Sequence, residues 1–165
     1  MFQIGDYVVY GVHDAYFAAG SKLVLTNTFG ASAHKMAGCD YTPRQVITAG
    51  VEIARKAAKK YDGYVALDIG PLGQLLEPMG SLTFEQAYED FAMQVKAGVA
   101  AGADLVFIET MTDLYEVKAA VLAVKENCDL PVFTTMSFEQ NMHTFAGTSL
   151  SSMAITLDSL GVDAL

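Results

Sequence analysis

The chain has 165 residues, of which 52 % are hydrophobic and 18 % are charged, so it can form one domain with its own core. A net charge of -9 without a clear basic patch argues against nucleic acid as a partner, because a row of phosphates needs basic side chains. No apolar run approaches a membrane span and no basic-then-apolar leader opens the sequence, so we expect a cytoplasmic protein without a membrane partner.

Helical and strand patterns alternate along the whole chain. In the first predicted helix, apolar residues recur at helical spacing, at Val8, Val12, Tyr16 and Ala19. Later helices begin with the capping boxes Thr42-Pro-Arg-Gln45 and Thr83-Phe-Glu-Gln86. The predicted helices cover residues 7–19, 42–60, 84–101 and 113–127, with one more from Ser149 or Ser151 to the residue before Gly161. The predicted strands cover residues 22–25, 64–67, 105–108 and 132–136, with the start of another at 162–165.

Three junctions repeat one design, in which a glycine ends a helix and a buried strand follows at once. These glycines are Gly20, Gly102 and Gly161. Regular alternation of helix and strand requires a parallel sheet with right-handed crossovers. No GxGxxG or GxxxxGK[ST] motif follows a strand, so nucleotide-binding versions of this plan lose support. We therefore predict an α/β fold, an incomplete (β/α)8 barrel with about four full parallel strands, the start of a fifth, and the helices outside.

Polar residues stand where each predicted strand ends, which is where such barrels keep their ligand groups. They are Thr26, Asn27 and Thr28 after the first strand, Asp68 before a Gly-containing turn, Glu109 after the third strand, and Ser137 after the fourth. The two acids can accept hydrogen bonds from an ammonium group, while hydroxyls and backbone N–H groups can hold a carboxylate. This set suits a small zwitterionic molecule. The alternative for Glu109 is that it caps the next helix or pairs with a lysine.

The cysteines and histidines give no metal or nucleophile motif. Cys39 and Cys128 lie far apart and neither belongs to a CxxC pair, so reduced thiols are expected. His13 falls inside the first predicted helix, and His34 and His143 lie in polar loops without an HExxH pattern. We expect none of the three histidines to be catalytic.

The strand-end segments, taken together, carry a resemblance to a known family. They are Leu25-Thr-Asn-Thr-Phe-Gly-Ala31, Asp68-Ile-Gly-Pro-Leu-Gly73, Ile108-Glu-Thr-Met-Thr-Asp113, and Thr135-Met-Ser-Phe138 with Thr144-Phe-Ala-Gly-Thr148. In this order and spacing they resemble the homocysteine S-methyltransferase family. The nearest likeness is to the N-terminal homocysteine-binding barrel of its cobalamin-dependent methionine synthase branch. The likeness extends from about Ala15 to Leu165.

The resemblance implies an enzyme that moves a methyl group from a methylcorrinoid, or a related donor, to the homocysteine thiol and so forms methionine. Zinc would lower the thiol pKa so that a thiolate exists at neutral pH. Methylcobalamin would be the donor, presented by corrinoid- and folate-binding domains or subunits. Glu109 matches the family acid that contacts the homocysteine amino group. The segment Thr26, Asn27, Thr28 and Phe29 matches a loop that lines the substrate.

The chain departs from the family in what it lacks. The family's zinc cysteines lie on later strands, and nothing in residues 1–14 resembles its first strand with an Asp-Gly motif. Residues 1–165 are therefore expected to form a partial barrel domain without a metal site. We expect this chain alone to be inactive, to bind no stoichiometric zinc and to associate through its open sheet edges.

Two alternatives remain open at the level of the sequence. One is a non-catalytic half-barrel that binds a small amino acid or a partner subunit. The other is a different barrel enzyme, such as an aldolase or an isomerase, with Glu109 as general base. No lysine stands at a strand end, which argues against a Schiff-base reaction.

Overall fold

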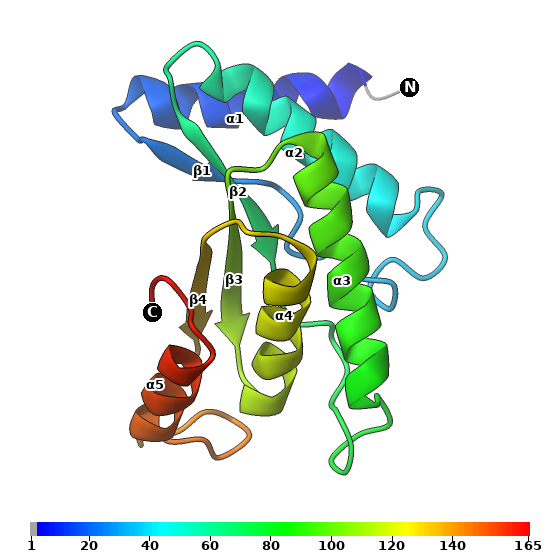
Figure 1. Ribbon diagram of the computed structural model, residues 1–165. Coiled ribbons are helices and arrows are strands. Elements are labelled where there is room, and N and C mark those ends of the chain that lie inside the picture. Colours follow the sequence, from blue (N-terminus) through cyan, green and yellow to red (C-terminus); the bar gives the residue numbers. More distant parts are fainter. Residues whose placement is uncertain (1–2) are drawn as a thin grey trace.

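The computed structural model describes the backbone of residues 3–165 and the side chains from Tyr7 onward, and in it helices and strands alternate without exception (Figure 1). The elements are α1 (Gln3–Ala18), β1 (Leu23–Leu25), α2 (Pro43–Ala58), β2 (Tyr64–Ile69), α3 (Phe84–Ala101), β3 (Leu105–Met111), α4 (Leu114–Asn127), β4 (Val132–Met136) and α5 (Leu150–Ser159). Among these described helices, none is long and apolar enough to cross a membrane.

The four strands form one sheet in the order β1-β2-β3-β4, and every neighbouring pair is parallel. Ala66 of β2 lies opposite both Leu25 and Leu105, while Phe107 of β3 lies opposite Asp68 and Phe133. Helices α2, α3 and α4 cover the same face of this sheet (Figure 1). The predicted wall of a parallel barrel with its helices outside is confirmed. Strands β2, β3 and β4 begin at the predicted residues, and β1 begins at Leu23 rather than at residue 22.

Of the predicted fifth strand, the structure shows a single bridge to β4. Ala164 pairs with Phe133 of β4 as a single parallel bridge, and the Thr134 N–H donates to the Ala164 carbonyl over 3.0 Å. This confirms the prediction of a strand start near Val162, next to β4.

Both predicted capping boxes are present and explain where α2 and α3 begin. The Thr42 and Thr83 side chains accept from the N–H groups of Gln45 and Gln86, whose own side chains return to the cap backbone. Helix α2 ends at Ala58 rather than at residue 60, because the Ala58 carbonyl accepts from Gly63 and Tyr61 in the tight turn toward β2.

Two of the three repeated glycine junctions, those at Gly102 and Gly161, carry a shared anchor at the amino ends of the strands. Asp104 accepts from the Val65 N–H at 2.8 Å and from Arg55 at 2.7 Å. Asp163 does the same with the Val132 N–H at 2.9 Å and Lys125 at 3.3 Å. Each aspartate stands two positions after a helix-ending glycine. It thereby fastens the incoming strand to its neighbour and satisfies an edge N–H group.

The buried face of helix α1 is not the face on which its apolar residues recur at helical spacing. His13 and Phe17 are buried, with Phe17 stacked on Tyr61, whereas Val12 and Tyr16 are 50 % and 63 % exposed. The exposed residues and the free edge of β1 line an open hollow of about 620 Å³. The spacing predicted the helix correctly, but the apolar face that carries Val8, Val12 and Tyr16 is exposed in the described chain.

The core lies between the sheet and helices α2 to α4. Val65, Leu67, Val106 and Ile108 project from the strands into it and are fully buried. Helix α3 approaches the sheet closely at Gly98, where an added Cβ would lie 2.5 Å from a methyl carbon of Leu67. This packing fixes the height of the strands and therefore of the polar residues at their carboxyl ends.

Candidate functional site

Asp68 is a buried acid at the carboxyl end of β2. Its residue is only 6 % exposed, and its Oδ1 atom has no hydrogen-bond partner among the described residues. Burial raises the pKa of Asp68 from 3.8 to about 7, and the negative charge of Glu109 and a hydrogen bond with it add to the rise. A hydrogen bond between two carboxyl groups needs a proton, and the raised pKa of Asp68 favours its protonated form.

Glu109 is turned toward Asp68 at an irregular point of β3. The strand continues past its predicted end to Met111, and its register against β4 shifts between Ile108 and Met111. Thr110 takes the left-handed conformation, with φ of 62°, and its N–H donates to the Thr135 hydroxyl over 3.1 Å. Bulges re-aim side chains, and a β-branched residue in this conformation is strained. Such strain tends to be kept where function requires the geometry.

The structure gives Glu109 neither of its two alternative roles, as the cap of the next helix or as the partner of a lysine. The cap of α4 is Asp113, whose carboxylate accepts from the Tyr115 N–H at 2.9 Å. Glu109 contacts Asp68, and none of the ion pairs in residues 7–165 includes it. A half-buried carboxylate that meets another acid instead of a cation is an unfavourable arrangement for stability alone.

Thr26 and Thr28, after the end of β1, bind the backbone of Asp68. Their hydroxyls lie 2.7 Å apart, the Thr26 hydroxyl accepts from the Asp68 N–H at 2.9 Å, and the Thr28 hydroxyl donates to the Asp68 carbonyl at 2.7 Å. Both residues are buried, and the Thr28 methyl group faces Gly50 of α2. Their polar atoms are therefore engaged in a clamp between the ends of β1 and β2.

The other residues predicted for the site lie at the ends of the outer strands β1 and β4. Asn27 is exposed, and Phe29 is 39 % exposed with its ring over Gly70, where an added Cβ would lie 2.6 Å from ring atoms. Ser137 is exposed at the end of β4, and its N–H donates to the Met111 carbonyl at 2.8 Å. The structure thus brings Phe29, Asp68 and Glu109 together and places Ser137 one strand further along.

Glu116 belongs to the same end of the molecule, and the sequence reasoning missed it. Its side chain lies on a buried side of α4, is 4 % exposed, and accepts from the Leu72 N–H at 2.7 Å. Burial raises the pKa of Glu116 to about 7, although the Leu72 hydrogen bond opposes the rise. The signal was readable, because Glu116 shares a helical stripe with Ala120 and Ala123, and both of those are buried.

Lys35, in the loop between β1 and α2, also lies near the site, and no pattern in the sequence indicated this. Its charge lowers the pKa of both Asp68 and Glu116, against the larger effect of burial. Its Nζ lies 4.8 Å from the centre of the Phe29 ring.

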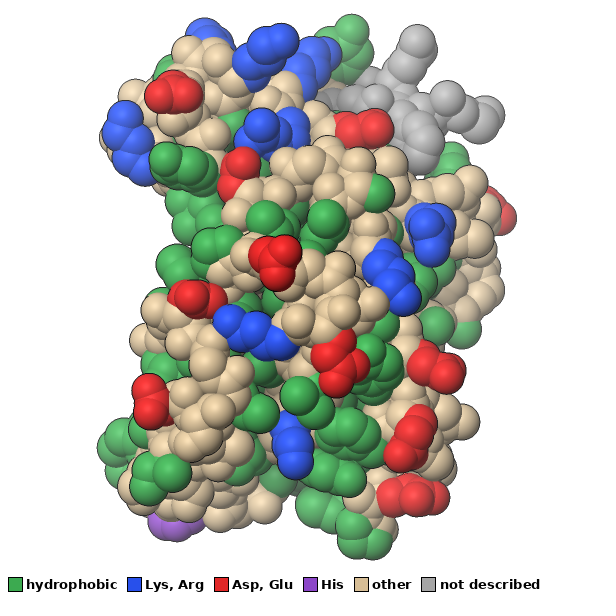
Figure 2. All heavy atoms as spheres, in the orientation of Figure 1, with side chains coloured by type: hydrophobic (Ala, Val, Ile, Leu, Met, Phe, Trp, Pro, Cys, Tyr) green, Lys and Arg blue, Asp and Glu red, His purple; other side chains and the backbone are tan. Residues whose placement is uncertain are grey.

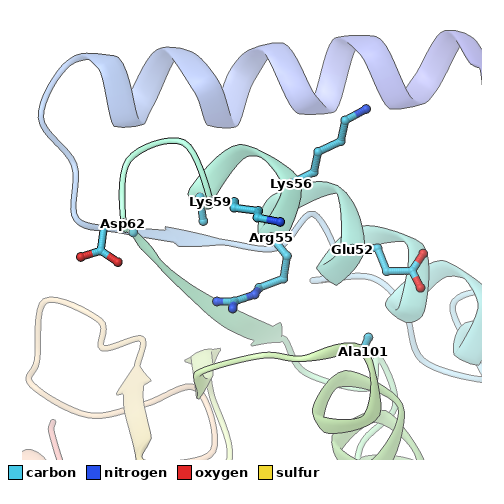
Figure 3. Close-up of a pocket in the computed structure, with 8 residues that line it drawn as sticks. Glu52, Arg55, Lys56, Lys59, Asp62 and Ala101 are labelled. Carbon is cyan, nitrogen blue, oxygen red and sulfur yellow. The ribbon is translucent and has the colours of Figure 1, made fainter.

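A separate hollow of about 650 Å³ lies at the opposite end of the sheet, where α2 leads into β2 (Figure 3). Its lining is charged, with Glu52, Arg55, Lys56, Lys59 and Asp62. Figure 2 shows basic side chains gathered at this end of the molecule. Residues 55–60 supply four of the ten basic residues of the chain, a local cluster that the overall charge had obscured. Arg55 is already paired with Asp104, and amino ends of parallel strands rarely carry ligand groups, so we do not assign the site here.

The described residues do not fit a metal centre. No group of three or more His, Cys, Asp or Glu side chains that could hold an ion occurs in the part of the chain that the structure describes. Cys39 and Cys128 are free thiols, the first in the loop before α2 and the second at the end of α4. His13 is buried in α1, burial lowers its pKa, and its Nε2 has no partner among the described residues.

A parallel sheet with helices on one face and two acids in contact at its carboxyl edge defines part of a (β/α) barrel. The family model of homocysteine S-methyltransferases matches residues 4–165, and the chain belongs to this family. The predicted resemblance is confirmed, and the relatives are enzymes.

Two curated relatives and one solved structure illustrate the kinship. The chain is 30 % identical over 167 residues to a methionine synthase of Mycobacterium tuberculosis (strain ATCC 25618 / H37Rv) and 29 % identical over 164 residues to that of Mycobacterium leprae (strain TN). In both matches 92 % of this chain aligns, with only 14 % of the relative. The metallated form of the homocysteine methyltransferase MmuM from Escherichia coli superposes with a TM-score of 0.86 at 21 % identity, over 97 % of this chain and 62 % of that one. The last likeness concerns the fold.

Proposed function

We propose that this chain supplies the amino-acid-binding wall of a barrel that transfers a methyl group to homocysteine. The observation that carries the proposal is the contact of buried Asp68 with half-buried Glu109 at the carboxyl edge of the sheet, in a chain of this family. An ammonium group placed beside the pair would satisfy the unpartnered Oδ1 of Asp68 and relieve the repulsion between the acids.

In this proposal each residue near the pair has a distinct role. Glu109 accepts from the ammonium group, and Asp68 supports it from the neighbouring strand. Thr26 and Thr28 act on the ligand through the clamp that fixes Asp68. Asn27, Phe29 and Ser137, which are exposed at the ends of β1 and β4, would line the rest of the amino acid. Glu116 holds the loop after β2 through Leu72.

The methyl transfer itself needs parts that the described residues do not provide. In the proposed reaction the homocysteine sulfur bonds to the methyl carbon, the bond between methyl and donor breaks, and the thiol proton is lost. We propose a methylcorrinoid as the donor and zinc as the group that lowers the thiol pKa, both held outside residues 7–165. The contribution of this chain is to bind and orient the substrate backbone. A cytoplasmic location, and corrinoid- and folate-binding domains as partners, belong to the same proposal.

The test is calorimetry with L-homocysteine on the protein that contains this chain, comparing wild type with Glu109→Gln. Loss of a hydrogen bond to a charged group is worth about 1.5–3 kcal/mol, so we expect binding to weaken by roughly 10- to 100-fold. Zinc content should stay unchanged, because Glu109 is no metal ligand in this scheme. Glu139→Gln, an exposed acid in the loop after β4, is the matched control and should bind normally. Unchanged binding by Glu109→Gln would contradict the role assigned to the pair.

A further inference from the structure

Lys35 is held in a defined position over the candidate site. Its ammonium group lies 4.8 Å from the centre of the Phe29 ring, and that ring in turn packs against Gly70, in the loop that follows Asp68. A cation over an aromatic face is attracted to it, which restricts a side chain that would otherwise move freely.

The backbone and stem of Lys35 are fastened to the same loop. The Ser32 hydroxyl accepts from the Lys35 N–H at 3.3 Å and donates to the Leu72 carbonyl at 3.1 Å. The side-chain stem runs past Gly73, where an added Cβ would lie 3.1 Å from Cε of Lys35. The loop after β1 therefore carries its lysine against the loop after β2, beside the carboxyl pair.

The charge of Lys35 is not neutralised there. Lys35 takes part in none of the ion pairs between residues 7 and 165, yet its positive charge lowers the pKa of both Asp68 and Glu116. The carboxyl groups of Asp68 and Glu109 meet at one point of the site, and Lys35 adds a positive charge nearby. An α-amino acid carries the complementary charges, an ammonium and a carboxylate on one carbon atom.

We propose that Lys35 binds the carboxylate of the amino acid whose ammonium group lies at the Asp68–Glu109 pair. The inference rests on the proposed function and adds a residue that selects zwitterions over simple amines. Backbone N–H groups of the loops can share the carboxylate, but Lys35 supplies the only full positive charge that the described residues bring to the pair.

The experiment combines two ligands with variants at Lys35. L-Homocysteine carries the carboxylate, and 3-aminopropane-1-thiol has the same skeleton without it. In the protein that contains this chain, Lys35→Gln should weaken homocysteine binding at least tenfold and leave the amine within twofold of wild type. Lys35→Arg keeps the charge and should retain most of the affinity. Lys59→Gln, an exposed lysine at the other end of the sheet, serves as the control.

Equal weakening of both ligands by Lys35→Gln, or no weakening of either, would overturn the role of Lys35. In that case the proposed function stands if Glu109→Gln still weakens both ligands. If wild type binds neither ligand, or if Glu109→Gln changes neither affinity, the proposed function fails and this inference fails with it. Circular dichroism of each variant checks that the fold is retained.

Discussion

Replacing Asp68 with asparagine should change how the stability of the protein depends on pH. In the folded state the pKa of Asp68 is raised from 3.8 to about 7, first by burial and then by Glu109. The folded protein therefore holds a proton that the unfolded chain releases above pH 4. The stabilising contribution of this group is fully present below its unfolded pKa and is lost as pH rises through the folded pKa.

The size of the effect follows from the two pKa values. The difference between 3.8 and about 7 corresponds to roughly 4 kcal/mol, by which ionised Asp68 destabilises the folded state above pH 7. Asparagine resembles the protonated acid, since its amide can donate to Glu109 and its carbonyl stays neutral. It also leaves the Thr26 and Thr28 clamp intact, because that clamp uses only the Asp68 backbone. We expect Asp68→Asn to be near neutral at pH 4 and stabilising by roughly 2–4 kcal/mol at pH 8.

Urea unfolding of both proteins at several pH values between 4 and 8 measures this directly. Asp163→Asn is a control with a different pH dependence, because the Val132 N–H lowers the pKa of Asp163 below its ordinary 3.8 and its contribution is lost only as pH falls further. It should therefore destabilise the protein by nearly the same amount at pH 8 and at pH 4. Parallel pH curves for wild type and Asp68→Asn would refute the argument that a buried, protonated Asp68 faces Glu109.

Three further changes test the packing, the bulge and the open edge. Gly98→Ala should destabilise by about 1–3 kcal/mol in urea unfolding, because its Cβ meets Leu67, whereas Gly11→Ala in α1 meets nothing within 4 Å and should not destabilise. Thr110→Gly should stabilise the protein by about 1 kcal/mol, because it removes a β-branched residue from the left-handed conformation. It should also weaken homocysteine binding, because Glu109 is then held less firmly. A loss of stability would show that Thr110 is not strained. Val12→Ser with Tyr16→Ser should reduce self-association of the chain in sedimentation velocity without loss of helix content, and unchanged association would place the contact elsewhere.

The sequence alone determined the order of the elements and the location of the polar edge. Alternating patterns, capping boxes and helix-ending glycines are local signals, and each depends on a few neighbouring residues. They placed the four strands and, through the rule for parallel sheets, indicated that Asp68 and Glu109 lie at one edge. The segment resemblance supplied the family, which the family model confirms.

The tertiary structure decided which atoms meet. Thr26 and Thr28 stand beside Asn27 in the sequence, but their hydroxyls bond to Asp68 because β1 and β2 pair in one particular register. Periodicity found helix α1 but not its buried side, since burial depends on the position of Tyr61 and of the sheet edge. The approach of Lys35 to the carboxyl pair depends on two loops packing across strands. Pairing between distant segments follows from the whole fold, and no local pattern encodes it.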